Sequence, residues 1–486
     1  MSTRQRDFRS AGPRLAILPR SVYLGIARAL TAVSLLVLFP MLFHIPAPQS
    51  AGAPETIAWV FLIISAIRII YLTFSNKPRV FEVAFWVFVY VFFGLAAAVQ
   101  IGQGRYPLFS GNYPESIIVD TQIRIALGIA SYCGGRWLWS RISMGRKSTW
   151  NWDRLVIDER RTQVFGIVGS VVALALIARA GPRSFFSSRY TLATAINSSL
   201  GKVHNGAVYN LNSHVGGSLQ TVFLTVPPLV VMVYLIVSGL WRRHKVLVAV
   251  LLVVNIVTNN PISNPRAWFG VVVIGFLSAF MDLSKRGRHV YFAIGLLVSL
   301  LLSLTYLGVF KSPLSETHKK PSISNELVQS ADYAMFQQEI NGTIYVNEHG
   351  FTKGRQLVGD VFVYAPHKLW IAKPGSTGIL VAQVEGLSGD WSLTIWTELF
   401  IDFGYPELVL AFVLIGYLFA HLDDVFARSS ARVAKVIIPM LATYSILLIR
   451  GSLQAEIGYG IPLVIMLFAC LRRDQVRNNS DGVAAI

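Results

Sequence analysis

The chain has 486 residues, of which 53% are hydrophobic and only 14% are charged, with a mean hydropathy of +0.54. Soluble domains are nearer a quarter charged, and apolar runs of about 18 or more residues recur along this chain, so its composition excludes an ordinary soluble protein. The formal net charge of +18 by itself fits a nucleic-acid partner, but its distribution along the chain argues otherwise.

The apolar runs predict an all-α polytopic membrane protein with about 12 transmembrane helices. The first run follows a basic tail and is too long for the apolar core of a signal peptide, so we expect a retained anchor. Cys133 and Cys470 fall within predicted spans, so we expect no disulfide framework and no metal site from them. The predicted spans cover about 22–43, 55–74, 80–100, 118–138, 163–180, 219–240, 245–259, 266–283, 289–309, 398–420, 434–450 and 456–471.

The distribution of lysine and arginine predicts the orientation of these spans. With the N-terminus inside, about 26 of the 43 lysines and arginines fall on the cytoplasmic side, in connections such as SNKPR, WRRHK and SKRGRH. This positive-inside pattern explains most of the net charge as topology, with some attraction to anionic membrane lipid, so no nucleic-acid partner is needed. We therefore predict a multi-pass membrane protein with both termini in the cytoplasm.

A long extracytoplasmic loop joins the ninth and tenth predicted helices. Its periodic stretches predict short helices at about 325–338 and 355–363, and we expect a small subdomain that rests on the bundle. The predicted regions are a cytoplasmic tail at 1–21, helices one to nine at 22–309, the loop at 310–397, helices ten to twelve at 398–471 and a cytoplasmic tail at 472–486.

Topology selects against arginine on the outer side, so the outward cations need a reason. Three sets of outer arginines come from separate helix ends, which a bundle brings together, and we expect a shared cationic pocket there. Guanidinium groups fit the paired oxygens of a lipid-linked pyrophosphate, although any single arginine could instead snorkel to ordinary lipid phosphates. The outward cations singled out are Arg179, Arg183 and Arg189 at the end of span five and after it, Arg266 at the start of span eight, Arg450 at the end of span eleven, and Lys353, Arg355, His367, Lys368 and Lys373 in the long loop.

Other charges near the spans have simpler interpretations. Arg28 and Arg68 lie near the inner ends of their spans and are expected to snorkel to lipid phosphates. Asp120 and Arg124 are one helical turn apart, and we expect them to neutralise each other within the bundle.

Several segments together resemble the Wzy-type oligosaccharide repeat-unit polymerases, in the broader group that includes O-antigen ligases. The matching pieces cover about residues 160–460 and recur in the order of that family. They are GPRSFFSSR after a middle span, NPRAWFG entering a later span, GDVFVYAPHKLWIAKP in the long loop, WSLTIWTELFIDFGYPELVLAFVLIG at the next span and RGS near the end. The chain departs from the family where His367 and Lys368 stand in place of an arginine nearer the tryptophan, which leaves open which of the two fills the cationic role.

The resemblance implies a metal-independent, inverting glycosyl transfer at the outer face of the bacterial inner membrane. The donor would be a growing glycan on polyprenyl pyrophosphate, and the acceptor a hydroxyl of a second lipid-linked repeat unit. The product would be a surface polysaccharide, such as O-antigen, capsule or exopolysaccharide, and no cofactor is expected. A chain-length regulator and a flippase of the same pathway are the expected protein partners.

The chemistry of such a transfer suggests roles for the outward residues. Negative charge develops on the departing pyrophosphate, and arginine or lysine stabilises it without a metal. We assign Arg189 and Arg266 to the pyrophosphate, with Arg183, Arg355 and Arg450 assisting. Glu398 is the best-placed general base for the acceptor hydroxyl, with His367 and His349 as alternates. Pro366 and Pro374 restrict the backbone that holds His367, Lys368 and Lys373 over the pocket.

Several of these residues also have structural explanations. Glu398 is equally consistent with an exposed carboxylate at a helix start, which the helix dipole favours, and His367 with loop packing. Trp396 is expected in the interfacial aromatic belt, whereas Trp370 fits either the belt or a sugar-stacking platform.

Two other functions remain open. An O-antigen ligase shares the donor but uses lipid A core as acceptor, and such ligases usually carry a His followed by Asn where His367 is followed by Lys368 here. A polysaccharide or lipid-linked oligosaccharide transporter would concentrate ionisable groups near the bilayer midplane, commonly in repeated halves, and we find no internal repeat.

Overall fold

The structure is a computed structural model of the whole chain. It describes residues 20–43, 52–108, 112–143, 152–187, 192, 212–264, 266–285, 287–306, 323–365, 369–386 and 391–474. Within these ranges the side chains of residues 20, 21, 212–223, 266, 267, 302–306, 323, 324 and 385 are not described.

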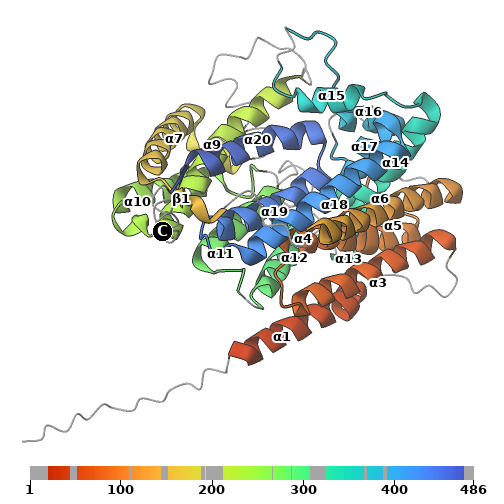
Figure 1. Cartoon of the computed structure of the whole chain (residues 1–486). Coiled ribbons are helices and arrows are strands. Elements are labelled where there is room, and N and C mark those ends of the chain that lie inside the picture. Colours follow the sequence, from red (N-terminus) through yellow and green to blue (C-terminus); the bar gives the residue numbers. More distant parts are fainter. Residues whose placement is uncertain are drawn as a thin grey trace, which may run out of the picture.

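The described part of the chain is almost entirely helical, with one pair of short strands (Figure 1). Element names beginning with η mark π-helices at η1 and η3 and 3-10 helices elsewhere. The elements are α1 Arg20–Val33, η1 Ser34–Leu38, α2 Phe39–Leu42, α3 Ala53–Phe74, α4 Val80–Phe88, η3 Val89–Ala96, α5 Ala97–Gln103, α6 Glu115–Ile142, η4 Trp152–Arg154, β1 Leu155–Ile157, α7 Glu159–Ala180, η5 Pro182–Phe186, α9 Asn212–Ser238, η6 Leu240–Arg242, α10 Lys245–Thr258, α11 Arg266–Phe280, α12 His289–Tyr306, α13 Ile323–Gln329, η8 Ala331–Tyr333, α14 Met335–His349, α15 Arg355–Val361, α16 Thr377–Ala382, η9 Gln383–Glu385, α17 Ile395–Phe403, α18 Tyr405–Arg428, α19 Ala434–Arg450, α20 Leu453–Ala469 and β2 Leu471–Arg473.

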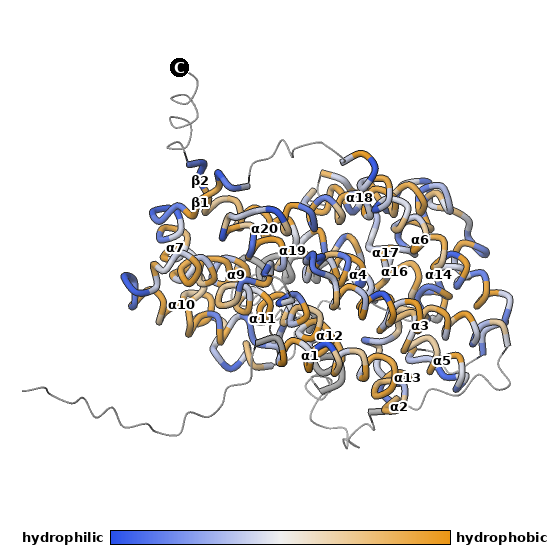
Figure 2. The backbone as a smooth tube through the Cα atoms, turned by 60° about the horizontal axis from the view of Figure 1, so that its bottom comes forward, coloured by the Kyte–Doolittle hydropathy of each residue, from blue (hydrophilic) through white to orange (hydrophobic). Residues whose placement is uncertain are grey.

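The expectation of a membrane-embedded helical protein is confirmed at the level of fold class. Hydrophobic residues run along most helices, and hydrophilic residues gather around β2 and at several helix ends (Figure 2). The helices long and apolar enough to cross a membrane within the described ranges are Val22–Leu42, Ala53–Phe74, Val80–Gln103, Glu159–Ala180 and Tyr405–Arg428. Shorter apolar helices accompany them at Leu224–Ser238, Lys245–Thr258, Trp268–Phe280, His289–Leu301 and Leu453–Ala469.

The continuous helix Val80–Gln103, made of α4, η3 and α5, forms the centre of the bundle. Its most apolar stretch is fully buried, whereas only 17% of the corresponding stretch of α7 is buried. α3, α12, α18 and α19 pack around α4, and α6 packs along α18. α4 has the aromatic-rich sequence VFEVAFWVF, and all of its residues are buried, so its side chains contact the surrounding helices on every side.

Trp396 of α17 lies in this core and not in an interfacial belt, so the expected location of Trp396 is wrong. Its side chain is buried, and its ring centroid is 4.3 Å from that of Phe412 and 5.0 Å from that of Phe93. The indole Nε1 donates to the Ile125 carbonyl at 3.2 Å, which satisfies the one polar atom of the side chain.

The connections that the charge pattern assigns to the cytoplasm meet at one end of the bundle. β1 pairs antiparallel with β2, with Leu155 opposite Arg473. Asp153 Oδ1 accepts the backbone N–H of Ala431 at 2.9 Å, which joins the segment before β1 to the α18–α19 connection. Lys435 Nζ lies 3.0 Å from Asp282 Oδ2 and joins the start of α19 to the α11–α12 connection. We call this end, marked by β1 and β2, the strand end.

The connections assigned to the outside meet at the opposite end, which we call the loop end because α13 to α16 lie there. α15 and α16 lie at the upper right of Figure 1, beside α14 and α17. Gln122 Nε2 donates to the Pro54 carbonyl at 2.7 Å, and Tyr113 Oη donates to Asn341 Oδ1 at 2.9 Å. The predicted loop helix at 355–363 is confirmed as α15, whereas the one at 325–338 is divided among α13, η8 and the start of α14.

Two other expectations about the spans are wrong. The predicted tenth span is broken at Gly404, whose φ of +73° favours glycine, so α17 ends at Phe403 and α18 starts at Tyr405. Arg124 pairs with Glu339 of α14 rather than with Asp120, which is exposed.

Candidate functional site

Glu398 lies at the loop end, in the first turn of α17. Its side chain is only 3% exposed, and its Oε1 accepts the backbone N–H of Leu453 at 3.0 Å. Leu453 is the first residue of α20, so the carboxylate stabilises an amide and the positive dipole end of that helix. The expectation of an exposed carboxylate at a helix start is therefore wrong: Glu398 is buried and joins α17 to the α19–α20 turn.

Arg450 closes α19 at the same turn. Its Nη2 lies 3.2 Å from Asp332 Oδ1 and donates to the Asp332 carbonyl at 3.0 Å, and its side chain is 12% exposed. Two residues later, Ser452 Oγ lies 3.1 Å from Ser376 Oγ in the connection before α16. The loop between α12 and α17 is thus bonded to both ends of the short α19–α20 turn, and Arg450 is neutralised by a carboxylate of that loop.

Arg355 is the first residue of α15 and is exposed. Asp402, near the C-terminus of α17, fixes the start of α15 because its carboxylate accepts the backbone N–H groups of Gln356 at 3.2 Å and Leu357 at 2.7 Å. α15 packs against both α17 and α20. The helix that carries Arg355 therefore lies beside the helices that carry Glu398 and follow Arg450.

Lys373 stabilises the segment 364–374, to which it belongs. Its Nζ donates to the Val363 carbonyl at 2.6 Å and to the Ala365 carbonyl at 3.1 Å, so it holds the two ends of the segment together. Partial burial lowers the pKa of Lys373 because it disfavours the charged amine. Tyr364 Oη donates to the Gly458 carbonyl at 2.7 Å and ties the segment to α20. His367 and Lys368, between these anchors, lie outside the described residues.

Arg183 projects from η5, which follows α7 and packs against α7 and α10. Arg183 is exposed, while its neighbour Phe185 is buried. Asn260 Nδ2 donates to the Phe185 carbonyl at 2.8 Å, so η5 lies against the α10–α11 connection. Arg189 lies just beyond the described end of this segment.

Arg266 is the first residue of α11, and its side chain is not among those described. The start of α11 is nevertheless fixed by Trp268, whose Nε1 donates to Asn259 Oδ1 at 2.9 Å. The Trp268 ring centroid is 6.4 Å from that of Tyr444 in α19 and 6.5 Å from that of Tyr459 in α20. Contacts therefore run from η5 through the α10–α11 connection to α20, to which Tyr364 is bonded.

The segments that carry the predicted site residues are thus joined in one chain of contacts at the loop end. α17, which carries Glu398, packs against both α15, which carries Arg355, and α19, which carries Arg450. Lys373 is connected to these helices through Tyr364 and α20. Arg183 is connected less directly, through Asn260. Arg189, His367 and Lys368 lie outside the described residues, and the side chain of Arg266 is not described.

Sequence reasoning missed three acidic residues that organise this end. Asp332 neutralises Arg450, Asp402 starts α15, and Glu339 neutralises Arg124. Asp402 precedes Phe403 and Gly404 at the break between α17 and α18, and the Gly-Tyr-Pro sequence that follows was a usable sign of a new helix start. Asp332 and Glu339 lie in a polar stretch without a comparable sign.

The described residues contain no group of three or more His, Cys, Asp or Glu side chains arranged to hold a metal ion. What the arrangement offers chemically is a buried carboxylate beside a helix N-terminus, with basic residues on the adjoining segments.

Comparison with protein-family models, with curated proteins and with solved structures gives no match for this chain.

Proposed function

We propose that this protein is a glycosyltransferase of the bacterial inner membrane that polymerises polyprenyl-pyrophosphate-linked oligosaccharide repeat units at the outer face. One observation carries the proposal: the separate segments GPRSFFSSR, NPRAWFG, YAPHKLWIAKP and RGS are connected at the loop end through the elements they share as neighbours, namely the α10–α11 connection, α20 and the segment before α16. Nothing in the local sequence requires these segments, up to 270 residues apart, to meet. A shared site for one large substrate is a reason for them to do so.

In the proposed reaction, an acceptor hydroxyl attacks the anomeric carbon of the donor glycan. A new carbon–oxygen bond forms on the face opposite the pyrophosphate, the bond to the pyrophosphate oxygen breaks, and the leaving group keeps the electron pair. Arg189 and Arg266 stabilise that developing charge electrostatically, with Arg183 and Arg355 assisting. Neither a metal nor a cofactor takes part.

Glu398 receives the proton of the acceptor hydroxyl in this scheme. Its Oε1 accepts the Leu453 N–H at the N-terminus of α20, where the helix dipole favours a negatively charged side chain. His367 is the alternative base, because it lies in the segment that Lys373 and Tyr364 anchor beside α20.

The geometry changes the roles proposed for two cations. Arg450 faces Asp332, and Lys373 is engaged with two backbone carbonyls, so both hold the site together while the remaining cations bind phosphate. Lys368 stays the proposed cation of the anchored segment.

The proposed topology has about 12 spans with both termini in the cytoplasm. It is supported by the grouping of the connections, since those with the positive-inside composition meet at the strand end and the others at the loop end. In this topology, 310–397 is the extracytoplasmic region. The chain-length regulator and the flippase of the same pathway remain the proposed partners.

A reconstituted reaction tests the proposal. Purified protein in detergent or liposomes is incubated with lipid-linked repeat units in the presence of a chelator, and products are separated on gels. A ladder of lengthening glycans on lipid is the expected result. Transfer only when lipid A core is added would make the protein a ligase, and movement of substrate across liposomes without a new glycosidic bond would make it a transporter. The variant Arg266→Ala, purified in parallel, controls for a contaminating polymerase.

A further inference from the structure

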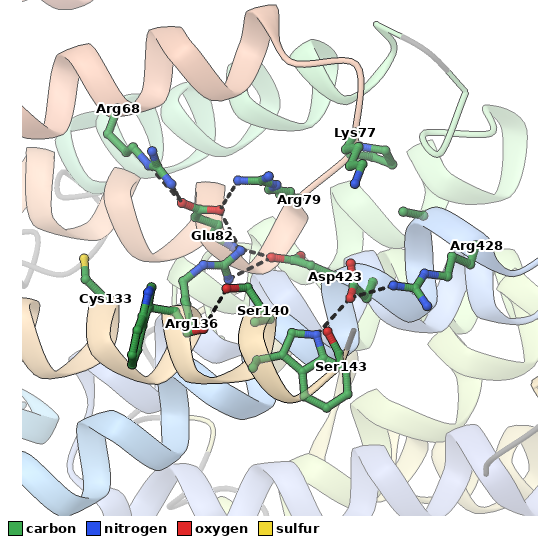
Figure 3. Close-up of a pocket in the computed structure, with 16 residues that line it drawn as sticks. Arg68, Lys77, Arg79, Glu82, Cys133, Arg136, Ser140, Ser143, Asp423 and Arg428 are labelled. Atoms are coloured by element: carbon green, nitrogen blue, oxygen red, sulfur yellow. Dashed lines mark hydrogen bonds and ion pairs between the residues drawn. The ribbon is translucent and has the colours of Figure 1, made fainter. Parts of the chain in front are cut away.

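A second charged region lies at the strand end, far from the proposed reaction. It is a cavity of about 750 Å³ between α3, α4, α6 and α18 (Figure 3). Four arginines and one lysine face three carboxylates there, which leaves a formal excess of two positive charges. The charged lining residues are Arg68, Lys77, Arg79, Arg136, Arg428, Glu82, Asp423 and Asp424.

Glu82 is the centre of this cluster. Its carboxylate accepts from Arg68 Nε at 2.8 Å, from Arg79 Nη1 at 3.3 Å and from Arg136 Nη2 at 2.6 Å, and its side chain is 1% exposed. Arg68 therefore points to a buried carboxylate and not to lipid, so the expectation that it snorkels is wrong. Asp423 is the second buried carboxylate; it lies 3.0 Å from Arg136 and accepts the backbone N–H of Phe81 at 2.9 Å.

These carboxylates hold the guanidinium groups in position but do not neutralise all of their positive charge. Glu82 shares one charge among three arginines, and Arg79 uses only one nitrogen in a bond to it. Lys77 is exposed, and its amine has no ion-pair partner among the described residues, whereas Arg428 is held 3.0 Å from Asp424. Lys77 and Arg79, just before the start of α4, are therefore the lining cations best able to bind an added anion.

The flanks of the cavity are apolar. Trp137, which lines the cavity, is 59% exposed, and Tyr71, which lies under the guanidinium of Arg68 at 5.1 Å, is 54% exposed. Ile67 on α3 and Leu138 on α6 add exposed aliphatic surface beside them. A ligand that fits both features needs an anionic head and a long apolar tail. Tryptophan and tyrosine at this level are also typical of a membrane interface.

We propose that this cavity binds the head group of an anionic glycerophospholipid, with its acyl chains along the exposed surfaces of α3 and α6. Basic pockets between helices at the cytoplasmic side suit such head groups. The excess of two positive charges favours a head group that carries two phosphodiesters, as in cardiolipin, over one that carries a single charge. The bound lipid links α3 with α4, α6 and α18 at the strand end. This inference stands independently of the glycosyltransferase proposal, since it uses none of its residues.

Cys133 allows a direct test because it lines the cavity and is exposed, whereas Cys470, the other cysteine of the chain, is buried. The full chain is placed in nanodiscs of phosphatidylcholine, and the rate of Cys133 modification by a maleimide is measured. Cardiolipin at a few mole per cent should slow modification several-fold. Phosphatidylglycerol at the same total charge should slow it less, and millimolar inorganic phosphate or pyrophosphate in the buffer should leave it unchanged.

The double variant K77Q/R79Q should weaken cardiolipin binding, measured as the lipid content needed for protection, about 25-fold, since each of the two cations near a phosphate contributes about a fivefold factor. The matched control is K245Q/R473Q, which removes one exposed lysine and one exposed arginine at the strand end outside this cavity. The parent and both variants are compared by gel filtration to establish folding. Failure of cardiolipin to protect the parent protein, equal protection of K77Q/R79Q, or equal protection by free phosphate would each overturn the proposal.

Discussion

Arg124 of α6 and Glu339 of α14 form an ion pair inside the protein, with Nη2 2.6 Å from Oε2 and both side chains at most 1% exposed. Arg124 Nη1 also donates to Thr343 Oγ1 at 3.0 Å, and Glu339 Oε1 accepts the Thr397 backbone N–H at 3.2 Å. The pair thus joins α6, α14 and α17, the helix that carries Glu398. α14 is consequently an integral part of the bundle, with ten consecutive or nearly consecutive residues buried, and not a lid on its surface.

Breaking this pair on one side should be more harmful than removing both charges. Glu339→Gln leaves Arg124 buried without a counter-charge, and we expect unfolding to become easier by about 3 kcal/mol or more. Arg124→Met combined with Glu339→Gln removes the uncompensated charge while the glutamine oxygen can still accept from Thr397, so the double variant should be the more stable of the two. Thermal unfolding in detergent measures this, and a double variant less stable than Glu339→Gln would contradict the explanation.

Glu398 has both a structural and a proposed catalytic role, and two substitutions separate them. Glu398→Gln retains an oxygen that can accept the Leu453 N–H but cannot take a proton, so transfer should slow by at least 100-fold with donor affinity and stability nearly unchanged. Glu398→Ala should lose about 1 kcal/mol of stability as well, because the start of α20 loses its acceptor. Rates of glycan extension and donor binding are measured for each. Extension by Glu398→Gln at the parental rate would place the base elsewhere.

Arg189 and Arg266 are predicted to bind the pyrophosphate, and their loss should abolish chain extension. Arg189→Ala and Arg266→Ala should each reduce the extension rate by at least 100-fold, since each removes stabilisation of the leaving group. Expression and membrane insertion should stay normal. The control is Arg288→Ala, a cation of the α11–α12 connection at the strand end. Polymer of normal length from both variants would exclude a pyrophosphate clamp built from these two arginines.

The contact between α6 and α18 predicts opposite effects at two adjacent glycines. A Cβ atom at Gly135 would lie 2.0 Å from the Val413 carbonyl oxygen, whereas one at Gly134 would have no neighbour within 4 Å. Gly135→Ala should therefore force the helices apart and cost about 1–3 kcal/mol of stability. Gly134→Ala should be neutral or slightly stabilising, because alanine favours the helix. The two variants are compared by unfolding in detergent, and equal stability would contradict the observed packing.

The positions of many helices could be predicted from the sequence because their boundaries are local. The predicted spans 245–259 and 434–450 nearly coincide with α10 and α19, because the apolar run of α10 stops at Asn259 and that of α19 stops at Arg450 and Gly451. The tenth span failed because hydrophobicity continues through Gly404, and only its backbone conformation divides α17 from α18.

The partners of charged residues could not be predicted in the same way, because they depend on tertiary contacts. Arg124 had a plausible partner one turn away, yet its actual partner is 215 residues further along the chain. The sequence suggested that Arg68 contacts lipid phosphates, but in the folded protein α4 places Glu82 beside it. For the candidate site, the local patterns identified the segments, but not that Asp332 would neutralise Arg450 or that Lys373 would bind carbonyl groups.

The pairing of β1 with β2 has a consequence for biogenesis. Residues 155–157 are synthesised about 300 residues before their partners at 471–473. Since ribosomes extend chains from the N-terminus and segments can fold only once their partners exist, the β1–β2 pair cannot form until residue 473 has been synthesised. A chain cut short before Leu471 would therefore lack this pairing, which holds the segment after η4 against the segment that follows α20.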